Sequence, residues 1–594
     1  MNIIARVTSL RDLMKTERID ALIIYGTDPH LSEYVPNNWR SIEWISGFTG
    51  SYGRVVITRD HALLWTDSRY FIQAQAQLKD TGFVLMKDRQ AESISIGQWL
   101  IQELDEGNVV AIDGFTLSSS EADKIKADLN AKSIHLTITR DLVSPNWKNR
   151  PALPPTTVVD YPIRFAGQSR SDKLTQIRKI LNEKHAEATL ICQLDDLAWS
   201  FNLRGCEIRY NPLFTGYGYI DQQKAILFVQ EGKLPVLLSD MLKREGIDVI
   251  NYESIWNMLS GRIPKSVYLD PDHTNSLAYQ FFSEKTRVVD GVAIPLLLKS
   301  VKNNVEIAGM RAAHRRDGAA MVNFLYWLDQ YTQEDELSEL SVAQRLRAFR
   351  ANQKYFMDES FTPIVAFGSH GAIVHYSATA QTDIRIAPDG ILLIDSGGQY
   401  LDGTTDITRT ISIGKVTATQ KSDFTLVLKG MIALAKVVFP VGTKGYSLDV
   451  LARKSLWEYG LNYGHGTGHG VGHYLSVHEG PVGIRQEFNR ENIQNGQIIT
   501  DEPGIYREGE YGIRIENVLL CKNESVSDSG QFLSFETLTL CPIEKRLINR
   551  KLMNNEEINW LNIYHKKVFR ALKPHLKEDV VKWLAKLCAP LENT

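Results

Sequence analysis

Apolar and polar positions alternate in two ways along the N-terminal part of the chain. Residues 21–26, 54–60 and 61–67 are short apolar runs with the length and composition of strands, and residues 11–18 and 93–105 have helical spacing. Strands that alternate with helices are typical of an α/β domain. The sequence therefore predicts that the chain begins with an α/β domain.

The same order returns further along the chain. An apolar run is followed by the tripeptide FTG and a second apolar run in residues 21–65, and again in residues 188–232. This repetition predicts a duplicated α/β domain. Between the copies, residues 145–155 hold four of the chain's 20 prolines, which lack a backbone donor and restrict their neighbours, so we expect an extended linker there.

The pattern changes after residue 302. Residues 304–331 and 341–353 have the periodicity of long amphipathic helices, and strands with unusual polar residues are expected from Ala372 onward. Residues 554–591 are again helical in pattern. One face of that tail carries apolar side chains suited to packing: Trp560, Leu561, Tyr564, Val568 and Leu572.

These patterns predict a fold of class α/β and α+β in three parts. We expect two α/β domains, at residues 1–155 and 156–301, and a third domain at residues 302–594 that includes a helical C-terminal extension. A chain of 594 residues is too long for one hydrophobic core, which agrees with several domains.

Composition narrows the possible partners. The formal net charge is −3 and 43% of the residues are hydrophobic, which favours neither nucleic acid nor an anionic membrane as a partner. No apolar run reaches the roughly 18 residues of a membrane-spanning helix, and residues 1–20 carry charges throughout. The five cysteines are widely spaced with no CxxC pair, so we expect reduced thiols and a cytoplasmic protein.

Candidate chemistry begins with two aspartates. Asp395 ends an apolar strand within residues 391–414, Asp406 is expected in the next strand, and the Asp402–Gly403 pair indicates a turn between them. A hairpin of that length can bring the two carboxylates together, and a bound cation would remove their repulsion. Taken alone, either aspartate could simply form a turn.

Histidines gather in a second segment. Residues 465–481 (HGTGHGVGHYLSVHEGP) contain four of the chain's 14 histidines among five glycines: His465, His469, His473 and His478. Imidazole is the commonest neutral ligand of transition metals, and glycine lets the backbone approach a ligand closely. A solvated loop with incidental histidines is the alternative, made unfavourable by their density.

Two glutamates lie in a third segment, residues 501–520. Glu502 precedes a Pro-Gly turn, and Glu516 follows alternating apolar residues, so that Glu516 and Arg514 share one face of a predicted strand. If that face points inward, the carboxylate needs a metal or an arginine as partner. If it points outward, the face is simply solvated.

Together the segments offer four carboxylates and an imidazole. Such a set suits Mn²⁺, Co²⁺, Zn²⁺ or Fe²⁺, and its oxygen content favours Mn²⁺. Five protein ligands exceed the about three that a single catalytic zinc uses, so a pair of ions with bridging carboxylates fits better. The residues alone thus predict a two-metal hydrolase.

At this point the chain resembles the pita-bread metallopeptidases, and within them the Xaa-Pro aminopeptidases (aminopeptidase P) in their three-domain form with creatinase-like N-terminal domains. The motifs that carry the resemblance are GAIVHY (371–376), LLIDSGGQYLDGTTDITRT (392–410), HGTGHGVGHYLSVHEGP (465–481) and DEPGIYREGEYGIRIENV (501–518). Further matches include WTDSRYF (65–71) and LDDLAWSFNLRG (194–205), so the resemblance covers nearly the whole chain.

The resemblance implies roles for particular residues. The implied metal ligands are Asp395, Asp406, His469, Glu502 and Glu516. Glu502 would also shuttle a proton. His375 and His478 would contact the substrate and stabilise the tetrahedral intermediate, and the substrate pocket would also involve His465, Arg514 and Arg69. Arg69 would reach the site from the first domain across a homodimer interface, although a surface salt bridge is an equal alternative.

The implied activity is the release of the N-terminal residue from peptides with proline at position two, by a metal-activated hydroxide at a dinuclear site. An Xaa-Pro dipeptidase (prolidase) with similar ligands is the alternative, and a metal-free binding scaffold is a further one. The chain departs from the family pattern at His370 and His473, where small or apolar residues are expected, and at residues 51–53, which read SYG instead of SAG. These histidines would be peripheral or would tune substrate access.

Overall fold

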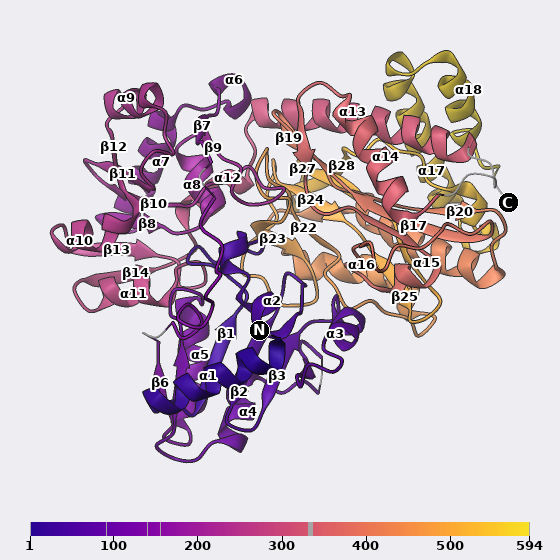
Figure 1. The fold of residues 1–594 in the computed structure, drawn as a ribbon. Helices are drawn as coiled ribbons and strands as arrows, with labels where there is room; N and C mark the ends of the chain where they lie inside the picture. The colour runs from indigo at the N-terminus through magenta and orange to yellow at the C-terminus, as the bar shows by residue number, and fades with distance from the viewer. Residues whose placement is uncertain (1, 91, 139–140, 155, 331–336, 593–594) are drawn as a thin grey trace. The chain divides into compact units, whose positions relative to one another are not determined.

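The structure is a computed structural model that describes residues 2–90, 92–138, 141–154, 156–330 and 337–592. It divides into two compact units, one comprising Met1–Ile163 with Gln168–Leu297, the other Arg164–Gly167 with Leu298–Thr594. Figure 1 traces both units in chain order. The boundary predicted at residue 155 falls outside the described residues, and the division at 155 and 301 stays a prediction.

The first unit contains two six-stranded sheets. The strands of the first sheet are β1 (Ala21–Tyr25), β2 (Arg54–Thr58), β3 (Ala62–Thr66), β4 (Val84–Lys87), β5 (Val109–Ile112) and β6 (His135–Thr137), in the order β4-β3-β2-β1-β5-β6. The second sheet contains β8 (Ala188–Ile191), β10 (Gly216–Asp221), β11 (Ala225–Val229), β12 (Ile247–Asn251), β13 (Ser266–Leu269) and β14 (Arg287–Asp290), in the order β12-β11-β10-β8-β13-β14.

The two sheets have the same topology. In each, the first strand pairs antiparallel with the second, the second antiparallel with the third, and the outer strands pair in parallel. The predicted duplication is therefore confirmed. The sheets are joined within the unit by buried polar contacts: His30 Nδ1 lies 2.8 Å from the Cys192 carbonyl oxygen, and Asn275 Nδ2 donates to the Pro29 carbonyl oxygen.

Helices surround these sheets, as the alternating pattern predicts. They are α1 (Ile3–Glu17), α2 (Ser41–Ser46), α3 (Phe71–Gln77), α4 (Ile96–Glu103), α5 (Ser119–Asn130), α7 (Arg170–Glu183), α8 (Leu194–Ser200), α9 (Val236–Arg244), α10 (Ile255–Ser260) and α11 (Ser276–Ser283). Two more helices, α6 (Ile163–Ala166) and α12 (Ile294–Ser300), include residues of both units. The helix predicted at residues 11–18 is the second half of α1, which begins earlier, at the Asn2 cap. The predicted helix at 93–105 is α4, where Ser95 forms a capping box with Gln98.

The second unit is built around antiparallel sheets. Its strands are β15 (Phe356–Glu359), β16 (Ile364–Phe367), β17 (Gly390–Ser396), β18 (Gly398–Tyr400), β19 (Gly403–Thr404), β20 (Ile407–Ile413), β21 (Val438–Pro440), β22 (Gly468–Gly470), β23 (Glu479–Ile484), β24 (Ile498–Asp501), β25 (Gly504–Arg507), β26 (Tyr511–Arg514), β27 (Asn517–Ser527) and β28 (Gly530–Thr537). The largest sheet runs β21-β28-β27-β24-β22-β23, and β16-β17-β20 form a second.

Long helices pack against these strands. They are α13 (Asn304–Gln330), α14 (Glu339–Ala351), α15 (Ala418–Ala435), α16 (Gly445–Trp457), α17 (Asn555–Leu572) and α18 (Glu578–Leu587). The predicted helices at 304–331 and 341–353 are α13 and α14, with residue 331 outside the described part. The helical tail prediction is confirmed, and four of its five stripe residues are buried, with Trp560 packed at the edge of the same core.

The strands expected from Ala372 onward are present, but the predicted starting point is wrong. A short 3-10 helix, η3 (Gly368–Ala372), precedes a turn-rich segment, and the next strand begins at Gly390.

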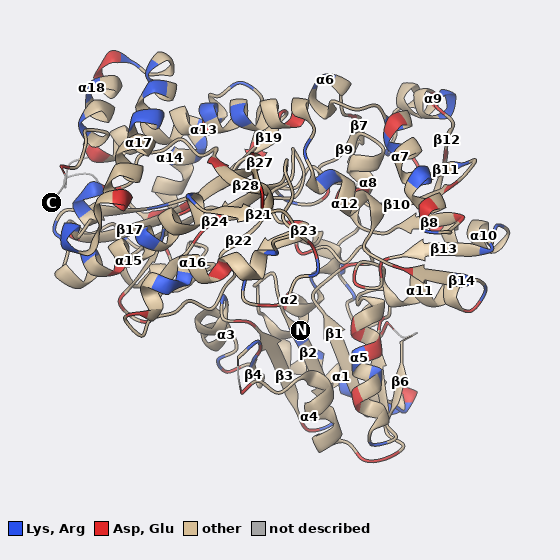
Figure 2. Ribbon diagram, turned by 180° about the vertical axis from the view of Figure 1, so that it is seen from behind, with Lys and Arg blue, Asp and Glu red and all other residues tan. Residues whose placement is uncertain are grey.

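Among the described residues, no helix is both long enough and apolar enough to cross a membrane. Figure 2 shows basic and acidic residues spread along α17 and α18.

Candidate metal centre

The two aspartates meet because β17 and β20 pair antiparallel. Asp395 near the end of β17 pairs with Thr408, two residues after Asp406, so the turn between the strands returns Asp406 to the level of Asp395. Asp406 lies immediately before β20, not within the strand as expected. Both aspartates are buried.

The other three predicted ligands come from neighbouring strands. His469 is the central residue of β22, Glu502 directly follows β24, and Glu516 occupies the break between β26 and β27, not a strand interior. The Thr408 hydroxyl donates to Glu516 Oε2 at 2.8 Å, and the Glu516 N–H donates to the Thr408 carbonyl oxygen at 3.1 Å. The hairpin with the aspartates is thereby fixed against the strand pair with the glutamates.

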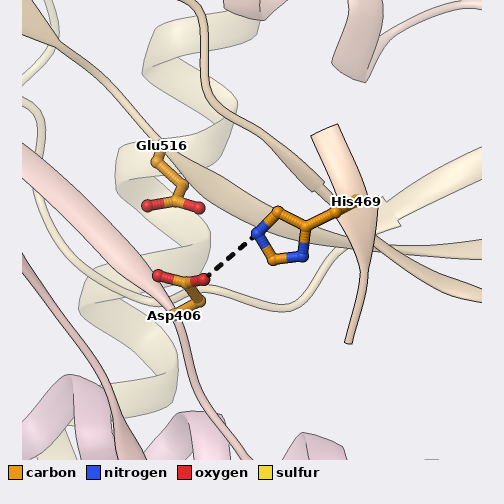
Figure 3. Close-up of side chains that lie close together, drawn as sticks. All are labelled: Asp406, His469 and Glu516. Carbon is orange, nitrogen blue, oxygen red and sulfur yellow. Dashed lines mark ion pairs between the residues drawn. The ribbon is translucent and has the colours of Figure 1, made fainter. Parts of the chain in front are cut away.

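Three of the five side chains converge on one small volume. Asp406, His469 and Glu516 each offer a ligand atom, and these atoms lie within 4.8 Å of one another. Figure 3 shows the two carboxylates and the imidazole directed toward a common space. His469 Nε2 lies 3.5 Å from Asp406 Oδ2 and 3.4 Å from Glu502 Oε1, so Glu502 borders the same space.

Asp395, the fifth predicted ligand, is held by Arg514. Its Oδ2 accepts from Arg514 Nη2 at 2.5 Å and from Nε at 3.2 Å. Its Oδ1 is buried without a hydrogen-bond partner among the described residues. A buried carboxylate oxygen left without a donor is costly, so this atom fits a ligand for a cation.

The electrostatics of the cluster point the same way. Burial, then the charges of Asp406 and Asp395, raise the pKa of Glu516 well above its ordinary value. Burial raises the pKa of Glu502 to about 7 against the opposing effect of His469. Carboxylates whose ionised forms disfavour one another are stabilised by a divalent ion, and the donor set therefore fits a metal centre.

The pKa of His469 is raised as well, although burial acts on it in the opposite sense. Burial alone would lower the pKa of His469, but the hydrogen bond with Asp406 and the charge of Glu502 outweigh it and raise that pKa to about 9. A ligand imidazole must be neutral, so His469 would give up its second proton when it holds a cation. His469 Nδ1 lies 2.9 Å from the Gly470 carbonyl oxygen, which leaves Nε2 to face the cluster.

Of two further predicted histidines, His478 contacts a predicted ligand, and His465 is linked to one through Tyr506 and Arg514. The rings of His478 and His469 are in edge contact, with their centroids 4.4 Å apart. His465 Nε2 lies 2.7 Å from the Tyr506 hydroxyl, which accepts from Arg514 Nη1 at 2.7 Å. Because Arg514 also holds Asp395, a continuous polar chain links His465 to a predicted ligand.

Sequence reasoning missed Tyr506. The signal lay in the hairpin of β25 and β26, where Tyr506 pairs with Gly512 and Gly504 pairs with Arg514. Predicting that Tyr506 meets His465 would have required the position of the glycine-rich loop relative to this hairpin.

A second missed group supports that loop from α16. Asp449 accepts from the Thr467 hydroxyl at 2.5 Å and from Arg453 Nε at 2.6 Å. Arg453 also donates to the carbonyl oxygens of Tyr463 and His465, both at 2.7 Å. This buried ion pair therefore fixes the backbone just before His469.

The remaining predicted substrate residues are His375 and Arg69. The half-buried His375 follows Val374, whose carbonyl oxygen lies 3.4 Å from Arg514 Nη2. Arg69 belongs to the other unit, where its guanidinium forms a bidentate pair with Asp67 and lies 3.7 Å from Glu33. Its part in substrate binding stays a prediction.

The two unusual histidines have distinct surroundings. His473 is buried, and its Nε2 would lie 3.0 Å from a Cβ placed on Gly309 of α13, so it packs against that helix. His370 Nδ1 lies 3.0 Å from each carboxylate oxygen of Glu339, the first residue of α14.

Four sequence models of known domains match consecutive parts of the chain. Sequence models of the Creatinase/Prolidase N-terminal domain match residues 6–140 and 149–306, that of Metallopeptidase family M24 matches residues 308–523, and that of the C-terminal region of peptidase M24 matches residues 531–591. The fold is thus two creatinase-like α/β domains followed by a pita-bread domain with a helical extension.

Full-length relatives agree with this assignment. Aminopeptidase P1 of Lotus japonicus is 37% identical over 98% of this chain and 99% of its own, and Xaa-Pro aminopeptidase ApepP of Drosophila melanogaster is 38% identical over the same shares. The crystal structure of X-prolyl aminopeptidase from Caenorhabditis elegans, described as a cytosolic enzyme with a di-nuclear active site, covers both chains completely with a TM-score of 0.96 at 36% identity. The chain therefore belongs to metallopeptidase family M24, and within it to the Xaa-Pro aminopeptidases.

Proposed function

We propose that this chain releases the N-terminal residue from peptides with proline at position two, and that Asp395, Asp406, His469, Glu502 and Glu516 hold two divalent ions. The convergence of Asp406, His469 and Glu516 within 4.8 Å carries the proposal. Glu502 Oε1 lies 3.4 Å from His469 Nε2, and the buried Asp395 Oδ1 has no hydrogen-bond partner among the described residues. The four carboxylates favour Mn²⁺ over Co²⁺ or Zn²⁺.

Bound ions would polarise the scissile carbonyl and activate water as the nucleophile. Glu502 takes a proton from the attacking water and delivers it to the leaving proline nitrogen, a role suited to a carboxyl whose pKa burial raises to about 7. His478 and His375 donate hydrogen bonds to the oxygen on which charge develops. Hydrogen bonds that run from His465 through Tyr506 to Arg514 orient Asp395.

The proline nitrogen explains why a dedicated site is needed. An Xaa-Pro bond is a tertiary amide without an N–H, so an enzyme that recognises this donor cannot bind it productively. Prolidase, which cleaves dipeptides, is the second candidate. The Xaa-Pro dipeptidase of Bacillus anthracis covers only 63% of this chain at 22% identity, which supports a shared fold alone.

Substrate assays separate these functions. The Mn²⁺-loaded protein should release arginine from Arg-Pro-Pro, whereas cleavage of Gly-Pro alone would indicate a prolidase. Failure to cleave either peptide, with no metal retained after dialysis, would leave a binding scaffold. Running the tripeptide assay with Co²⁺ and Zn²⁺ as well ranks the metals.

Ligand variants test the site itself. Asp406→Ala and Glu516→Ala should abolish turnover and lower metal content, measured by plasma mass spectrometry, without unfolding the chain. Glu510→Ala is the matched control, because Glu510 is an exposed carboxylate in the turn of the β25–β26 hairpin. Wild-type activity in either ligand variant would contradict the assignment.

We further propose that the chain forms a homodimer through α16. Apolar side chains are exposed on this helix and beside it: Tyr446, Val450, Trp457, Tyr459 and Phe488. The Tyr446 and Phe488 rings lie 5.6 Å apart, and Tyr446, Val450 and Trp457 share one helix face. Exposed apolar patches of this kind mark protein interfaces.

Light scattering after gel filtration tests the dimer. The wild-type protein should have twice the chain mass of 67.2 kDa, and Trp457→Asp should halve it, whereas Ile563→Asp, at an exposed apolar residue of α17, should not. A monomeric wild type would refute the dimer.

The proposed role of Arg69 in substrate binding has its own test. Arg69→Ala should weaken turnover of longer peptides more than that of tripeptides, and equal loss would refute this role.

We also propose a cytoplasmic location. The five cysteines are unpaired, and three of them are buried, as expected of a chain that folds in a reducing compartment. Immunodetection in separated cell fractions should find the protein in the soluble cytoplasmic fraction, and recovery from the secreted fraction would contradict this.

A further inference from the structure

The buried carboxylate of Glu339, which is not one of the predicted ligands, contacts three hydrogen-bond donors within residues 367–376. Glu339 is completely buried at the start of α14. Its Oε1 accepts from the Phe367 N–H at 2.8 Å and its Oε2 accepts from the Tyr376 hydroxyl at 2.7 Å. His370 Nδ1 lies 3.0 Å from both oxygens.

The chemistry of these contacts fixes the donor. A carboxylate offers only acceptor atoms, so His370 Nδ1 carries a hydrogen and donates it to Glu339. The first turn of α14 adds a favourable field for a negative charge at this place. Hydrogen bonds to an ionised acceptor are roughly twice as strong as neutral ones. The three contacts together therefore form a stable lock, which we call the Glu339 lock.

The lock holds the segment that carries His375. Its donors Phe367, His370 and Tyr376 lie before, within and after the turn of η3, and Tyr376 is the neighbour of His375. The rings of His370 and Tyr376 are also in contact, with centroids 4.4 Å apart. The segment is thus tied at both ends and at its middle to one buried group.

Two contacts on the opposite side join this segment to the metal centre. The backbones of Gly371 and Gly512 touch so closely that a Cβ on Gly512 would lie 1.7 Å from the Gly371 carbonyl oxygen. Arg514, which holds Asp395, also reaches the Val374 carbonyl oxygen. Residues 371–375 therefore lie between the Glu339 lock and the strand that orients Asp395.

We propose that His370 is a positioning residue for the reaction, acting through His375. Its bond to Glu339 sets the turn of η3 and hence the place from which His375 donates to the substrate. The inference rests on the proposed function, because it assigns a task to a residue that the substrate does not touch. It also explains why an imidazole stands at a position where a small or apolar residue was expected.

Positioning affects the transition state more than the bound substrate. A displacement of a catalytic group by about 1 Å can cost about 100-fold in rate. We therefore expect His370→Ala to lower kcat for Arg-Pro-Pro by between about tenfold and about 100-fold, with KM changed by less than about threefold. Manganese content should stay at the wild-type level, since none of the five predicted ligands contacts His370.

A conservative variant and a control distinguish positioning from general damage. His370→Asn keeps a side-chain N–H near the place of Nδ1 and should recover most of the lost kcat. His575→Ala removes an exposed imidazole from the C-terminal extension and should leave kcat unchanged. If His370→Asn is as slow as His370→Ala, or if His370→Ala turns over at the wild-type rate, the positioning role is overturned.

Action through His375 is tested by a double-mutant cycle. In a His375→Gln background, His370→Ala should cost little further rate, because the group that it positions is already gone. Additive losses would refute the inference. His375→Gln with wild-type kcat would instead refute the role of His375 in the proposed function.

Hydrogen exchange provides a measurement that does not depend on activity. In His370→Ala, peptides covering residues 371–378 should exchange faster than in the wild type, while those covering residues 465–481 should not change. Unchanged exchange in residues 371–378 would overturn the lock even in a protein that cleaves no Xaa-Pro peptide. Failure of the wild type to cleave Arg-Pro-Pro would refute the proposed function and leave this structural result standing.

Discussion

Removal of Lys302 should destabilise the second unit far more than removal of an exposed lysine. Lys302 Nζ contacts Glu479 Oε1, and the two side chains are 1% and 2% exposed. Glu479 directly follows His478, so this ion pair also anchors a predicted substrate residue. In Lys302→Met the carboxylate stays buried without its cation.

The cost follows from burial. Removing one partner of a buried ion pair typically destabilises a protein by about 3–5 kcal/mol. The unfolding entropy is about 2.1 cal/mol/K per residue, and the unit has roughly 300 residues, so this loss corresponds to about 5–8 °C in melting temperature. Lys302→Met/Glu479→Gln should recover part of the loss, because no buried charge then remains.

Differential scanning calorimetry measures the shift, with Lys582→Met as the matched control. Lys582 pairs with Glu578 on α18 at 2.7 Å, with side chains 71% and 83% exposed. Such a surface pair contributes about 0–1 kcal/mol, which predicts a shift below about 2 °C. If Lys302→Met melts as close to the wild type as Lys582→Met does, the reasoning from burial is wrong.

Three further outcomes are expected. Burial lowers the pKa of His565 to about 3, below the roughly 6.5 of the unfolded chain. The free energy of unfolding should therefore fall by up to about 1.4 kcal/mol per pH unit as the pH drops from 6.5 toward 3. Denaturant titrations should show a shallower fall in His565→Leu, and an equal fall would contradict the assignment. Burial raises the pKa of Glu502 to about 7, so calorimetry should show proton release on Mn²⁺ binding and affinity that rises with pH; pH-independent affinity would contradict this. Gly512→Ala must push the strand away from Gly371 and should lower kcat at wild-type metal content. The control Gly261→Ala, whose Cβ would lie 3.6 Å from its nearest neighbour, should have no effect. Normal turnover in Gly512→Ala would refute the argument.

Local patterns in the sequence were sufficient for much of the fold. The strands predicted at 21–26, 54–60 and 61–67 are β1, β2 and β3. They could be predicted because apolar runs of that length are buried in a sheet whatever elements pack beside them. The duplication was visible for the same reason, since each copy repeats its order of strands. The strands were predicted to start too early, at Ala372, because contacts with Gly512 and Glu339 that strand propensity does not reveal hold this part of the chain.

The residues proposed for the metal centre were likewise predicted from the sequence. Each of the three motifs places its acidic or histidine residues beside turns, and the resemblance to known metallopeptidases assigned Asp395, Asp406, His469, Glu502 and Glu516 by position. The structure brings Asp406, His469 and Glu516 together and places Glu502 beside His469, while Asp395 is held by Arg514.

Tertiary structure alone decided what surrounds these side chains. The contacts of Arg514 with Asp395, of Tyr506 with His465, and of Glu339 with His370 join residues that lie 119, 41 and 31 positions apart. The contact of Arg514 with Asp395 depends on strand register, because a shift of one residue would turn either side chain to the opposite face. The contacts of Tyr506 and Glu339 depend on how a loop and a helix pack against the strands. The sequence by itself determined which groups could bind a metal, and only the packing of strands, loops and helices determined which groups orient them.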